Sequence, residues 1–546
     1  MSPLPRGDDP FYKTGRDMPT FKLDGKSIPF EPGESIIRAA EKAGVEIPHY
    51  CYHPGLSAPA NCRMCLVEIL PAANQRAMML DIVEWDEKLG DYRTIKKPKL
   101  QPACQFPATD GQEVLAEQSP HVIAARAGVQ EFLLLNHPVD CPICDQAGEC
   151  KLQDYWLEHQ QTPKRMHDEP VHKPKAVSFG DTIVYDAERC VMCTRCIRFM
   201  EEVAKDPVLD MRERGNLKEV IVAPGRKLEG HYTFMTEHVC PVGALTTKDF
   251  RFKARVWFLK SAKTVCQGCA TGCNATFDYD PRTNKALRYR PRDNERVNKF
   301  WMCDEGMLSY REVVEGRVPE AQVSGKTVKI ERALEEIKKR FASVQKGSIA
   351  FVLSAKHSLE DNLALFELAE LCGSRAIYTS GAPSGYSDDI LIHADKNSNT
   401  AGIQNLAPDA KSFDALLADA RAGKVTHVIA LGGAAPTDDV SALEGLQGLC
   451  VVAAHAGPLT RAASVVLPAS AWIEASGTFV NAKGMRQLAE KGTEPLGSAE
   501  PGWKLVAKVA VHLGVEPSWT TLKDVRAMLV ATSVPPPEPS QTASAE

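Results

Sequence analysis

The stretch from His137 to Cys150, which reads HPVDCPICDQAGEC, constrains this chain more than any other. It holds one imidazole and three thiols, at His137, Cys141, Cys144 and Cys150. A CxxC pair places two thiolates on one tight loop, which suits a tetrahedral metal ion or an iron–sulfur cluster. Taken alone, the histidine could cap a helix or lie in a core, but its place just before CPxC favours ligation. An imidazole in place of a thiolate removes negative charge near iron, so we expect a raised reduction potential.

The number of cysteines indicates the compartment. The chain has 17 cysteines in 546 residues, and its first residues, MSPLPRGDDPFYKTGRDMPTF, show neither a secretory signal nor a transit peptide. We therefore expect a reducing cytoplasm, where grouped cysteines bind metals rather than form disulfides. The net charge of −5 does not point to nucleic acid or to an anionic membrane. No stretch approaches the roughly 18 uncharged apolar residues of a membrane span.

The first hundred residues predict a ferredoxin-like domain of the plant type. TFKL-DG-KSIPF reads as a hairpin around Asp24-Gly25, and GESIIRAAEKAG as a helix capped by Ser35 and ended by Gly44. A C-x10-C-x2-C spacing with a distant fourth cysteine is a two-iron pattern, wider at the front than C-x4-C-x2-C. The predicted ligands are Cys51, Cys62, Cys65 and Cys104. Residues 71–99 look like an inserted hairpin, which makes Cys104 the least constrained of the four. A structural zinc site is the alternative.

A third cysteine set follows a helix that we expect to open at Ser119-Pro120 and to end at the His137 motif. CVMCTRC with a remote C-P is the bacterial four-iron pattern. Because position 200 is Met, we expect the C-P cysteine to close the same cluster. The predicted ligands are Cys190, Cys193, Cys196 and Cys240. A zinc knuckle is the alternative.

A fourth set, in CQGCATGC and WMCDEG, comprises Cys266, Cys269, Cys273 and Cys303. Its C-x2-C-x3-C-x29-C spacing resembles the four-iron site at the front of molybdopterin oxidoreductases. Zinc is a more serious rival here, since four remote thiols do not require iron. The basic stretch RTNKALRYRPRDNERVNK between these ligands is better read as a solvated loop or an acidic partner's docking face than as a nucleic-acid site.

From about residue 320 the chain changes character. The two remaining cysteines, Cys372 and Cys450, lie in apolar surroundings and are predicted core residues. GSIAFVLSA, VTHVIALGG and CVVAAH read as buried strands between helices such as SLEDNLALFELAELCG, capped by Ser358. This alternation predicts a doubly wound α/β domain. Neither GxGxxG nor GxxxxGK occurs, so we expect no NAD, FAD or ATP site of the usual kinds.

The predicted fold class is therefore α+β ferredoxin-like cluster domains followed by an α/β, Rossmann-like domain. The predicted segments are a flexible lead-in (1–17), a β-grasp two-iron domain (18–110), a domain with the second and third sets (111–255), a domain with the fourth set (256–315), the α/β domain (316–530) and a disordered tail (531–546).

Several motifs together resemble a known family. HPVDCPICDQAGECKLQD, IPHYCYHPG, NCRMCLVEI and CTRCIRFMEE are similar to the large iron–sulfur subunit, the G subunit, of NADH–quinone oxidoreductase, which is respiratory complex I. The resemblance is specific over about residues 18–310 and weak to about 515. It implies an electron carrier between a flavin-bearing, NADH-oxidising subunit and a ferredoxin-like subunit on the way to quinone. Other peripheral-arm subunits are implied partners, on the cytoplasmic side of a bacterial inner membrane that the chain meets only through the complex.

The resemblance also implies the cofactors. The first set would hold a 2Fe-2S cluster and the other three sets 4Fe-4S clusters, the fourth being found in some bacterial members only and lying off the main electron path. The chain itself would bind neither NADH nor quinone and would carry no catalytic residue. Ala60 departs from the family's usual Gly, for which we expect a small loop adjustment with ligation unaffected.

The C-terminal part resembles a molybdopterin oxidoreductase domain through VLPASAWIEASGTFVNAKGMRQ. Lys483 and Met485 replace an expected Glu and Arg, DEGM follows Cys303 in place of basic residues, and about two hundred residues are missing between the two α/β halves. We expect a relic without molybdopterin. The alternatives are a subunit of an NAD-linked formate dehydrogenase, a subunit of an NAD-linked hydrogenase, and a binding module with four structural zinc sites.

Overall fold

The computed structural model describes residues 18–70, 78–163 and 165–531. The chain divides into two compact units. Unit 1 contains the chain up to Glu229 together with Thr236–Arg251, and unit 2 contains Gly230–Met235 together with the chain from Phe252 onward. The expected lead-in, residues 71–77 of the expected insertion and all but the first residue of the expected tail lie outside the described residues. The finer domain boundaries stay predictions.

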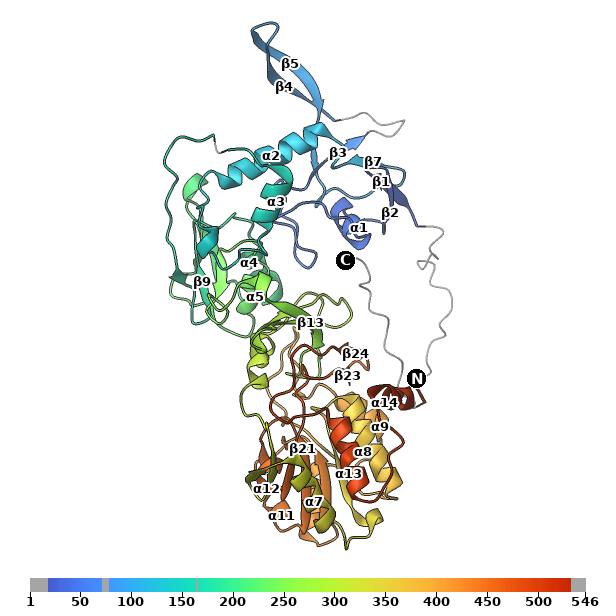
Figure 1. Cartoon of the computed structure of the whole chain (residues 1–546). Helices are drawn as coiled ribbons and strands as arrows, with labels where there is room; N and C mark the ends of the chain where they lie inside the picture. Colours follow the sequence, from blue (N-terminus) through green and yellow to red (C-terminus); the bar gives the residue numbers. More distant parts are fainter. Residues whose placement is uncertain (1–17, 71–77, 164, 532–546) are drawn as a thin grey trace. The chain divides into compact units, whose positions relative to one another are not determined.

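The elements of unit 1 are short apart from one hairpin and one helix (Figure 1). Its strands are β1 (Thr20–Leu23), β2 (Lys26–Pro29), β3 (Leu66–Leu70), β4 (Met79–Asp86), β5 (Asp91–Pro98), β6 (Gln101–Pro102), β7 (Glu113–Leu115), β8 (Val177–Ser178), β9 (Ile183–Tyr185), β10 (Leu209–Arg212), β11 (Glu219–Val222) and β12 (Leu245–Thr247). Its helices and helical turns are α1 (Ile36–Lys42), α2 (Pro120–Leu134), η1 (Cys141–Ile143), α3 (Lys151–His159), α4 (Arg195–Arg198), η2 (Phe199–Val203), η3 (Gly215–Leu217) and α5 (Phe234–His238), the last of which begins in unit 2.

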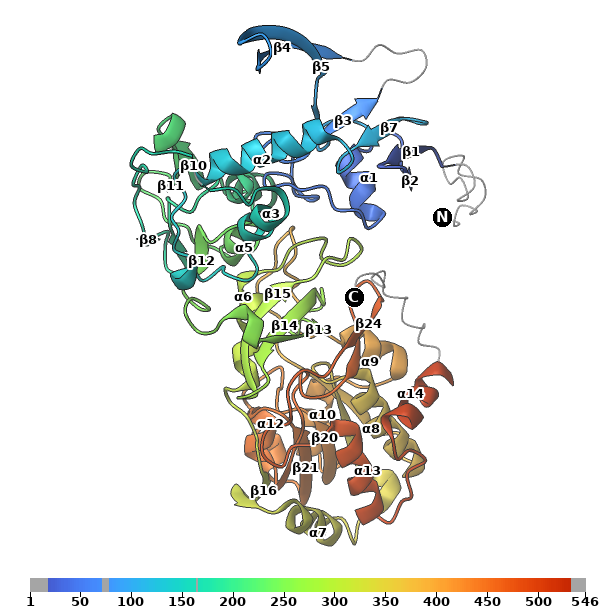
Figure 2. The ribbon, with the colours of Figure 1, turned by 45° about the horizontal axis from the view of Figure 1, so that its top comes forward.

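The ferredoxin-like sheet has the strand order β2-β1-β7-β3-β6. Asp24 and Gly25, at φ +48° and +84°, form the predicted two-residue turn between β1 and β2. The Ser35 hydroxyl accepts a hydrogen bond from the Arg38 amide at 3.4 Å, which confirms the predicted cap of α1. Helix α2 lies beside β3 at this sheet (Figures 1 and 2) and opens, as predicted, with Ser119 as its cap.

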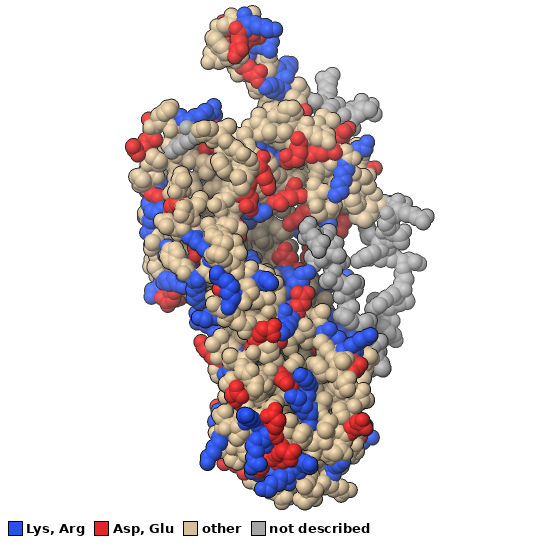
Figure 3. All heavy atoms as spheres, in the orientation of Figure 1, with Lys and Arg blue, Asp and Glu red and all other residues tan. Residues whose placement is uncertain are grey.

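The hairpin of β4 and β5 confirms the expected insertion for the part of it that the structure describes. Trp85 and Tyr92 lie opposite each other and form an edge-to-face pair, although both side chains are more than half exposed. Acidic and basic side chains lie side by side on its surface (Figure 3), with Arg93 Nε 3.1 Å from Asp86 Oδ2. No hairpin residue belongs to the hydrophobic core of this part of the chain.

Unit 2 joins a small antiparallel sheet to a larger, mostly parallel one. Its strands are β13 (Lys260–Val265), β14 (Asn274–Asp280), β15 (Lys285–Pro291), β16 (Ala321–Val323), β17 (Lys326–Val328), β18 (Ala350–Ser354), β19 (Ile377–Ser380), β20 (His427–Leu431), β21 (Gly448–Ala453), β22 (Val465–Pro468), β23 (Gly477–Val480) and β24 (Arg486–Ala489). Its helices and helical turns are η4 (Val256–Phe258), α6 (Asp304–Leu308), η5 (Ser309–Val313), α7 (Ile330–Arg340), η6 (Lys346–Ser348), α8 (Leu359–Leu371), α9 (Thr400–Leu406), α10 (Phe413–Arg421), α11 (Ser441–Glu444), α12 (Pro458–Ala462), α13 (Gly502–His512) and α14 (Leu522–Ala531).

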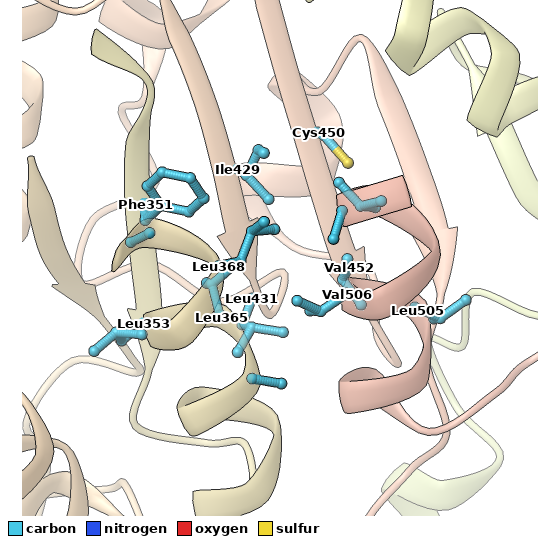
Figure 4. Packing of buried hydrophobic residues seen from close by; sticks show 14 of the residues in the cluster. Phe351, Leu353, Leu365, Leu368, Ile429, Leu431, Cys450, Val452, Leu505 and Val506 are labelled. Carbon is cyan, nitrogen blue, oxygen red and sulfur yellow. The ribbon is translucent and has the colours of Figure 1, made fainter. Parts of the chain in front are cut away.

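The larger sheet has the order β17-β16-β22-β21-β20-β18-β19, and β22, β21, β20, β18 and β19 run parallel. Successive strand residues point to opposite faces, so Phe351 and Leu353 face α8 and α13 (Figure 4), whereas Val352 belongs to a second core with α10. Helices therefore cover both faces, as buried parallel strands require. Cys450 lies fully buried in the first core, as predicted, and Cys372 packs there too.

The length and polarity of the helices decide whether one of them could span a membrane. Within the ranges that the structure describes, every helix is too short or too polar to cross a membrane.

Candidate metal centres

The first cysteine set is gathered in one loop region of unit 1. The thiols of Cys51 and Cys62 lie close enough to interact, as do those of Cys65 and Cys104. The Ala103 amide donates to the Cys65 carbonyl at 2.9 Å, because β6 pairs with β3. Cys104 is thus brought back to the loop in spite of the long insertion. The four thiols are free of disulfides, and their ligation of a cluster stays a prediction.

Left-handed backbone conformations shape the cysteine loops. Ala60 and Arg63 have φ of +51° and +62°, and Met192 and Thr194 have +53° and +62°. At such positions the peptide amides can turn inward, and the Met192 amide donates to the Cys190 sulfur at 3.4 Å. Ala60 adopts the conformation that glycine would favour, at a cost of roughly 1–2 kcal/mol. Alanine therefore carries backbone strain here, and the expected loop adjustment stays a prediction.

The second set lies between α2 and α3. Cys141 opens the turn η1, Cys150 caps α3, and the thiols of Cys141, Cys144 and Cys150 lie close enough for their charges to interact. Burial raises the pKa of Cys150 to about 11. Burial also lowers the pKa of His137 to about 4, so the ring is neutral at pH 7 and available as a ligand. Ligation by His137 stays a prediction.

In the third set Cys193 and Cys196 are buried, and Cys190 and Cys240 are partly buried. The charges of Cys190, Cys193 and Cys240 all act on the thiol of Cys196. Cys240 thus joins the three cysteines of CVMCTRC, as the C-P pattern predicts. Burial raises the pKa of Cys190 to about 11, so protons must leave when these thiols bind metal.

These three sets adjoin one another within unit 1. Asn61, next to Cys62, donates from Nδ2 to the carbonyl of Met192, next to Cys193, at 3.4 Å, which joins the first loop to the third. A methyl group on Gly243, three residues after Cys240, would lie 2.4 Å from the Cys144 sulfur, which joins the third set to the second. The contacts form a continuous series from the first set through the third to the second.

Two arginines beside CVMCTRC strengthen this series, and the sequence pattern alone did not predict them. Arg189 Nη2 lies 2.6 Å from Asp140 Oδ2 in the HPVDC motif. Arg198 donates to the carbonyl of Cys51 at 2.6 Å. The signal was a basic residue on each side of the motif, but nothing in the sequence gives their partners, which lie about 50 and 150 positions away.

The fourth set lies in unit 2. The charges of Cys266, Cys269 and Cys303 act on the thiol of Cys273. Burial raises the pKa of Cys266 to about 12. The Gly306 amide donates to the Cys303 sulfur at 3.3 Å. Four thiols are again brought together.

Asp304 anchors the loop of the fourth set. Its carboxylate accepts hydrogen bonds from the Thr233 amide at 2.8 Å, the Thr233 hydroxyl at 2.6 Å and the Phe234 amide at 2.9 Å. These donors lie in Gly230–Met235, the segment that leaves unit 1 to join unit 2. The DEGM that replaces basic residues thus has a structural use.

The donor chemistry of all four sets fits iron–sulfur groups. The thiols are uncombined and mostly buried, and amides donate to several sulfurs, as cluster-binding loops require. No group of three or more His, Cys, Asp or Glu side chains in the described ranges is arranged so that it could hold a metal ion. The ligands of a cluster stand around a larger body than an ion.

A cavity of about 190 Å³ lies at the carboxyl ends of β18, β20 and β21. Its wall includes Lys356, His357, Asp361, His455 and Ser470, and no cysteine. Small-molecule pockets usually measure about 300–1,000 Å³. The volume of this cavity lies below that range.

Four family models match segments of the chain. They are a 2Fe-2S iron-sulfur cluster binding domain (residues 16–86), the NADH-ubiquinone oxidoreductase-G iron-sulfur binding region (126–165), the NADH-quinone oxidoreductase subunit 3 ferredoxin-like domain (180–246) and molybdopterin oxidoreductase (407–511). The first three segments contain the predicted ligands of the first three sets except Cys104.

Curated relatives match over different lengths. The G subunit of NADH-quinone oxidoreductase from Streptomyces coelicolor is 36% identical over 54% of this chain and 32% of that protein. The G subunit from Rickettsia conorii is 27% identical over 93% of this chain and 89% of that protein. The mitochondrial NADH-ubiquinone oxidoreductase 78 kDa subunit of Neurospora crassa is 33% identical over 70% and 49%.

The match spans about a third of the length of the first of these relatives. The chain has ferredoxin-like and 2Fe-2S segments at its N-terminal side and a molybdopterin-oxidoreductase-like segment at its C-terminal side. These segments and the similarity to its relatives identify the chain as a homologue of the G subunit of NADH-quinone oxidoreductase.

Proposed function

We propose that this chain is the electron-transfer subunit of an NADH:quinone oxidoreductase. The observation that carries the proposal is the continuous series of three cysteine sets in unit 1, each inside or beside a segment that matches an iron–sulfur family model. One bound 2Fe-2S and three bound 4Fe-4S clusters would each take up and release one electron at a time. The chain's own part is to hold, space and desolvate them.

The residues proposed to hold the clusters are those of the four sets. They are Cys51, Cys62, Cys65 and Cys104; His137, Cys141, Cys144 and Cys150; Cys190, Cys193, Cys196 and Cys240; and Cys266, Cys269, Cys273 and Cys303. The fourth set lies in the other unit from the series, which supports a place off the main electron path.

The proposed partners are a flavin-bearing subunit that oxidises NADH, a ferredoxin-like subunit that takes the electrons towards quinone, and further subunits of the peripheral arm. The proposed place is the cytoplasmic side of a bacterial inner membrane, reached only through the complex. We further propose that the C-terminal domain is Rossmann-like and holds no molybdopterin, which the parallel sheet with helices on both faces and the small cavity support.

Metal content per chain tests the proposal. Protein purified without oxygen should contain about 14 iron atoms, no molybdenum and little zinc. Stoichiometric molybdenum would overturn the interpretation of the C-terminal domain as a relic and favour an enzyme with its own substrate. About ten iron atoms with one zinc would mean that one set, in the first instance the Cys266 to Cys303 set, is structural. Zinc at every site would overturn electron transfer, since zinc is not redox-active.

A further inference from the structure

Arg198 is a buried arginine that reaches two cysteine loops at once. Its side chain leaves α4 and is 8% exposed. One terminal nitrogen donates to the carbonyl of Cys51 at 2.6 Å and to that of Cys193 at 3.2 Å. The other donates to the carbonyl of Ser57, and Nε donates to the Thr194 hydroxyl at 3.2 Å. The rigid fork of a guanidinium thus fixes the first and third loops in one geometry.

The acceptors of Arg198 leave its charge without a direct counter-ion. All four are neutral oxygen atoms. Burying a cation among neutral acceptors costs solvation energy that nearby negative charge must offset. Desolvation lowers the pKa of Arg198, and the charges of Cys193, Cys51 and Glu202 oppose that shift. Two of these three are predicted cluster ligands, one from each set.

Further contacts hold the same two loops together. Glu202 accepts a hydrogen bond from the Ser57 amide at 2.9 Å, and Asn61 Nδ2 donates to the Met192 carbonyl at 3.4 Å. Arg195 donates to the Tyr52 carbonyl. The loop of residues 51–62 therefore lies against residues 192–202 along its length. Arg198 is the member of this contact that touches a predicted ligand of each set.

We propose that Arg198 is a positioning residue that holds the first cluster against the third and raises the reduction potential of both. The inference rests on the proposed function, because it requires both sets to bind clusters. Clusters held by these two sets would exchange single electrons, one being oxidised as the other is reduced, with no proton or further reactant. A fixed positive charge favours the more negative, reduced form of each cluster.

The test uses the full chain with its iron–sulfur content, purified without oxygen, in three variants. Arg198→Met removes the charge and the hydrogen bonds at similar length, and Arg198→Lys keeps the charge but loses the fork. The control is Arg212→Met, since Arg212 is an exposed arginine on β10 that pairs with Glu219. The measurements are iron per chain, a reductive titration of each cluster, and the magnetic broadening of the two-iron signal by its reduced neighbour.

In Arg198→Met the reduction equilibria of the two clusters should shift about tenfold towards the oxidised form, which is ~59 mV for each couple. The other clusters should titrate as in the parent, and the magnetic interaction should weaken. Arg198→Lys should keep the potentials within about twofold of the parent equilibria and weaken the interaction. If the Met variant loses iron, the Lys variant carries the comparison.

Three outcomes distinguish a failure of the proposed role of Arg198 from a failure of the proposed function. Unchanged potentials and unchanged magnetic interaction in both Arg198 variants would overturn the role of Arg198. An equal shift in Arg212→Met would overturn it too, since the effect would then be that of any lost charge. A parent chain without iron–sulfur signals would instead overturn the proposed function.

Discussion

At the residue scale, Gly243 gives the sharpest prediction. A methyl group at this position would lie 2.4 Å from the Cys144 sulfur, well inside contact distance. We expect Gly243→Ala to displace that sulfur and to lower the iron content by about four atoms per chain, the content of one four-iron cluster. Gly128→Ala is the control, because a methyl group there meets nothing within 4 Å. Full iron content in Gly243→Ala would contradict the predicted role of Cys144.

Replacing Ala60 by glycine is expected to stabilise the protein. Its φ of +51° suits glycine, so Ala60→Gly should stabilise the loop by about 1 kcal/mol. The midpoint of urea unfolding, followed without oxygen by visible absorbance, should rise. Ala58→Gly, in the same loop but without a positive φ, should lower it, since glycine gains entropy in the unfolded chain. A fall in both variants would show that the strain at Ala60 is not relieved.

The predictability of the residues differs by kind. The cysteine sets are predictable because local spacing fixes which thiols share a loop, and the C-P pattern indicates Cys240. The return of Cys104 depends on the pairing of β6 with β3, which has no clear signal in the sequence. Arg189 and Arg198 were not readable as linkers, since their partners lie far away in sequence. The left-handed conformation of Met192 has no sequence signal either, because methionine does not favour it.

At the scale of elements, the β4–β5 hairpin is expected to be dispensable for cluster binding. Replacing residues 79–98 by a short Gly-Ser linker should leave the iron content unchanged, because no hairpin residue contributes to the core of the ferredoxin-like domain.

By contrast, Ile28→Ala removes a fully buried side chain of that core and should lower the free energy of unfolding by about 2–5 kcal/mol. Iron analysis and thermal melting of both variants check this, and iron loss on hairpin removal would refute it.

The contact between α8 and α13 predicts a pH effect. Desolvation raises the pKa of Asp361 in α8 to about 6, and its carboxylate accepts a hydrogen bond from the Trp503 amide in α13 at 2.7 Å. Between pH 4 and 6 the folded state holds a proton that the unfolded state releases, so stability falls as pH rises through this window.

The matching variant is Asp361→Asn, which cannot lose this proton. The melting temperature of each protein is compared between pH 5 and pH 7. The fall over this range should be smaller in the variant than in the parent, and the two falls should differ by roughly 2–4 °C. Asp409→Asn, at an exposed site, is the control and should follow the parent. Parallel profiles for parent and Asp361→Asn would show that the carboxyl does not titrate in this window.

Elements with caps and periodic patterns were predictable. The β1–β2 hairpin, α1, α2, α8 and the buried strands all lie where turn and cap residues indicate. The central place of β7 in its sheet was not predictable. A strand of three residues carries no periodic signal, and its parallel pairing with β1 depends on tertiary contacts.

At the scale of the whole molecule, the two units are expected to respond differently to iron removal. Three of the four cysteine sets lie in unit 1, whereas unit 2 has large apolar cores around its parallel sheet. Chelation should therefore unfold unit 1 first. Five of the seven tryptophans lie in unit 2, including the fully buried Trp519, so tryptophan emission should stay near its folded value while visible absorbance is lost. Simultaneous loss of both signals would contradict two separable units.

The exchange of Gly230–Met235 between the units bears on how the chain is made. On the ribosome, Cys240 emerges before Asp304, whose carboxylate fixes Thr233 and Phe234. At ~5–20 residues per second the interval is roughly 3–13 s. During that time Thr233 and Phe234 lack the carboxylate that accepts their hydrogen bonds in the folded chain. Translation thus completes Cys240 several seconds before the carboxylate that fixes the segment leading into it.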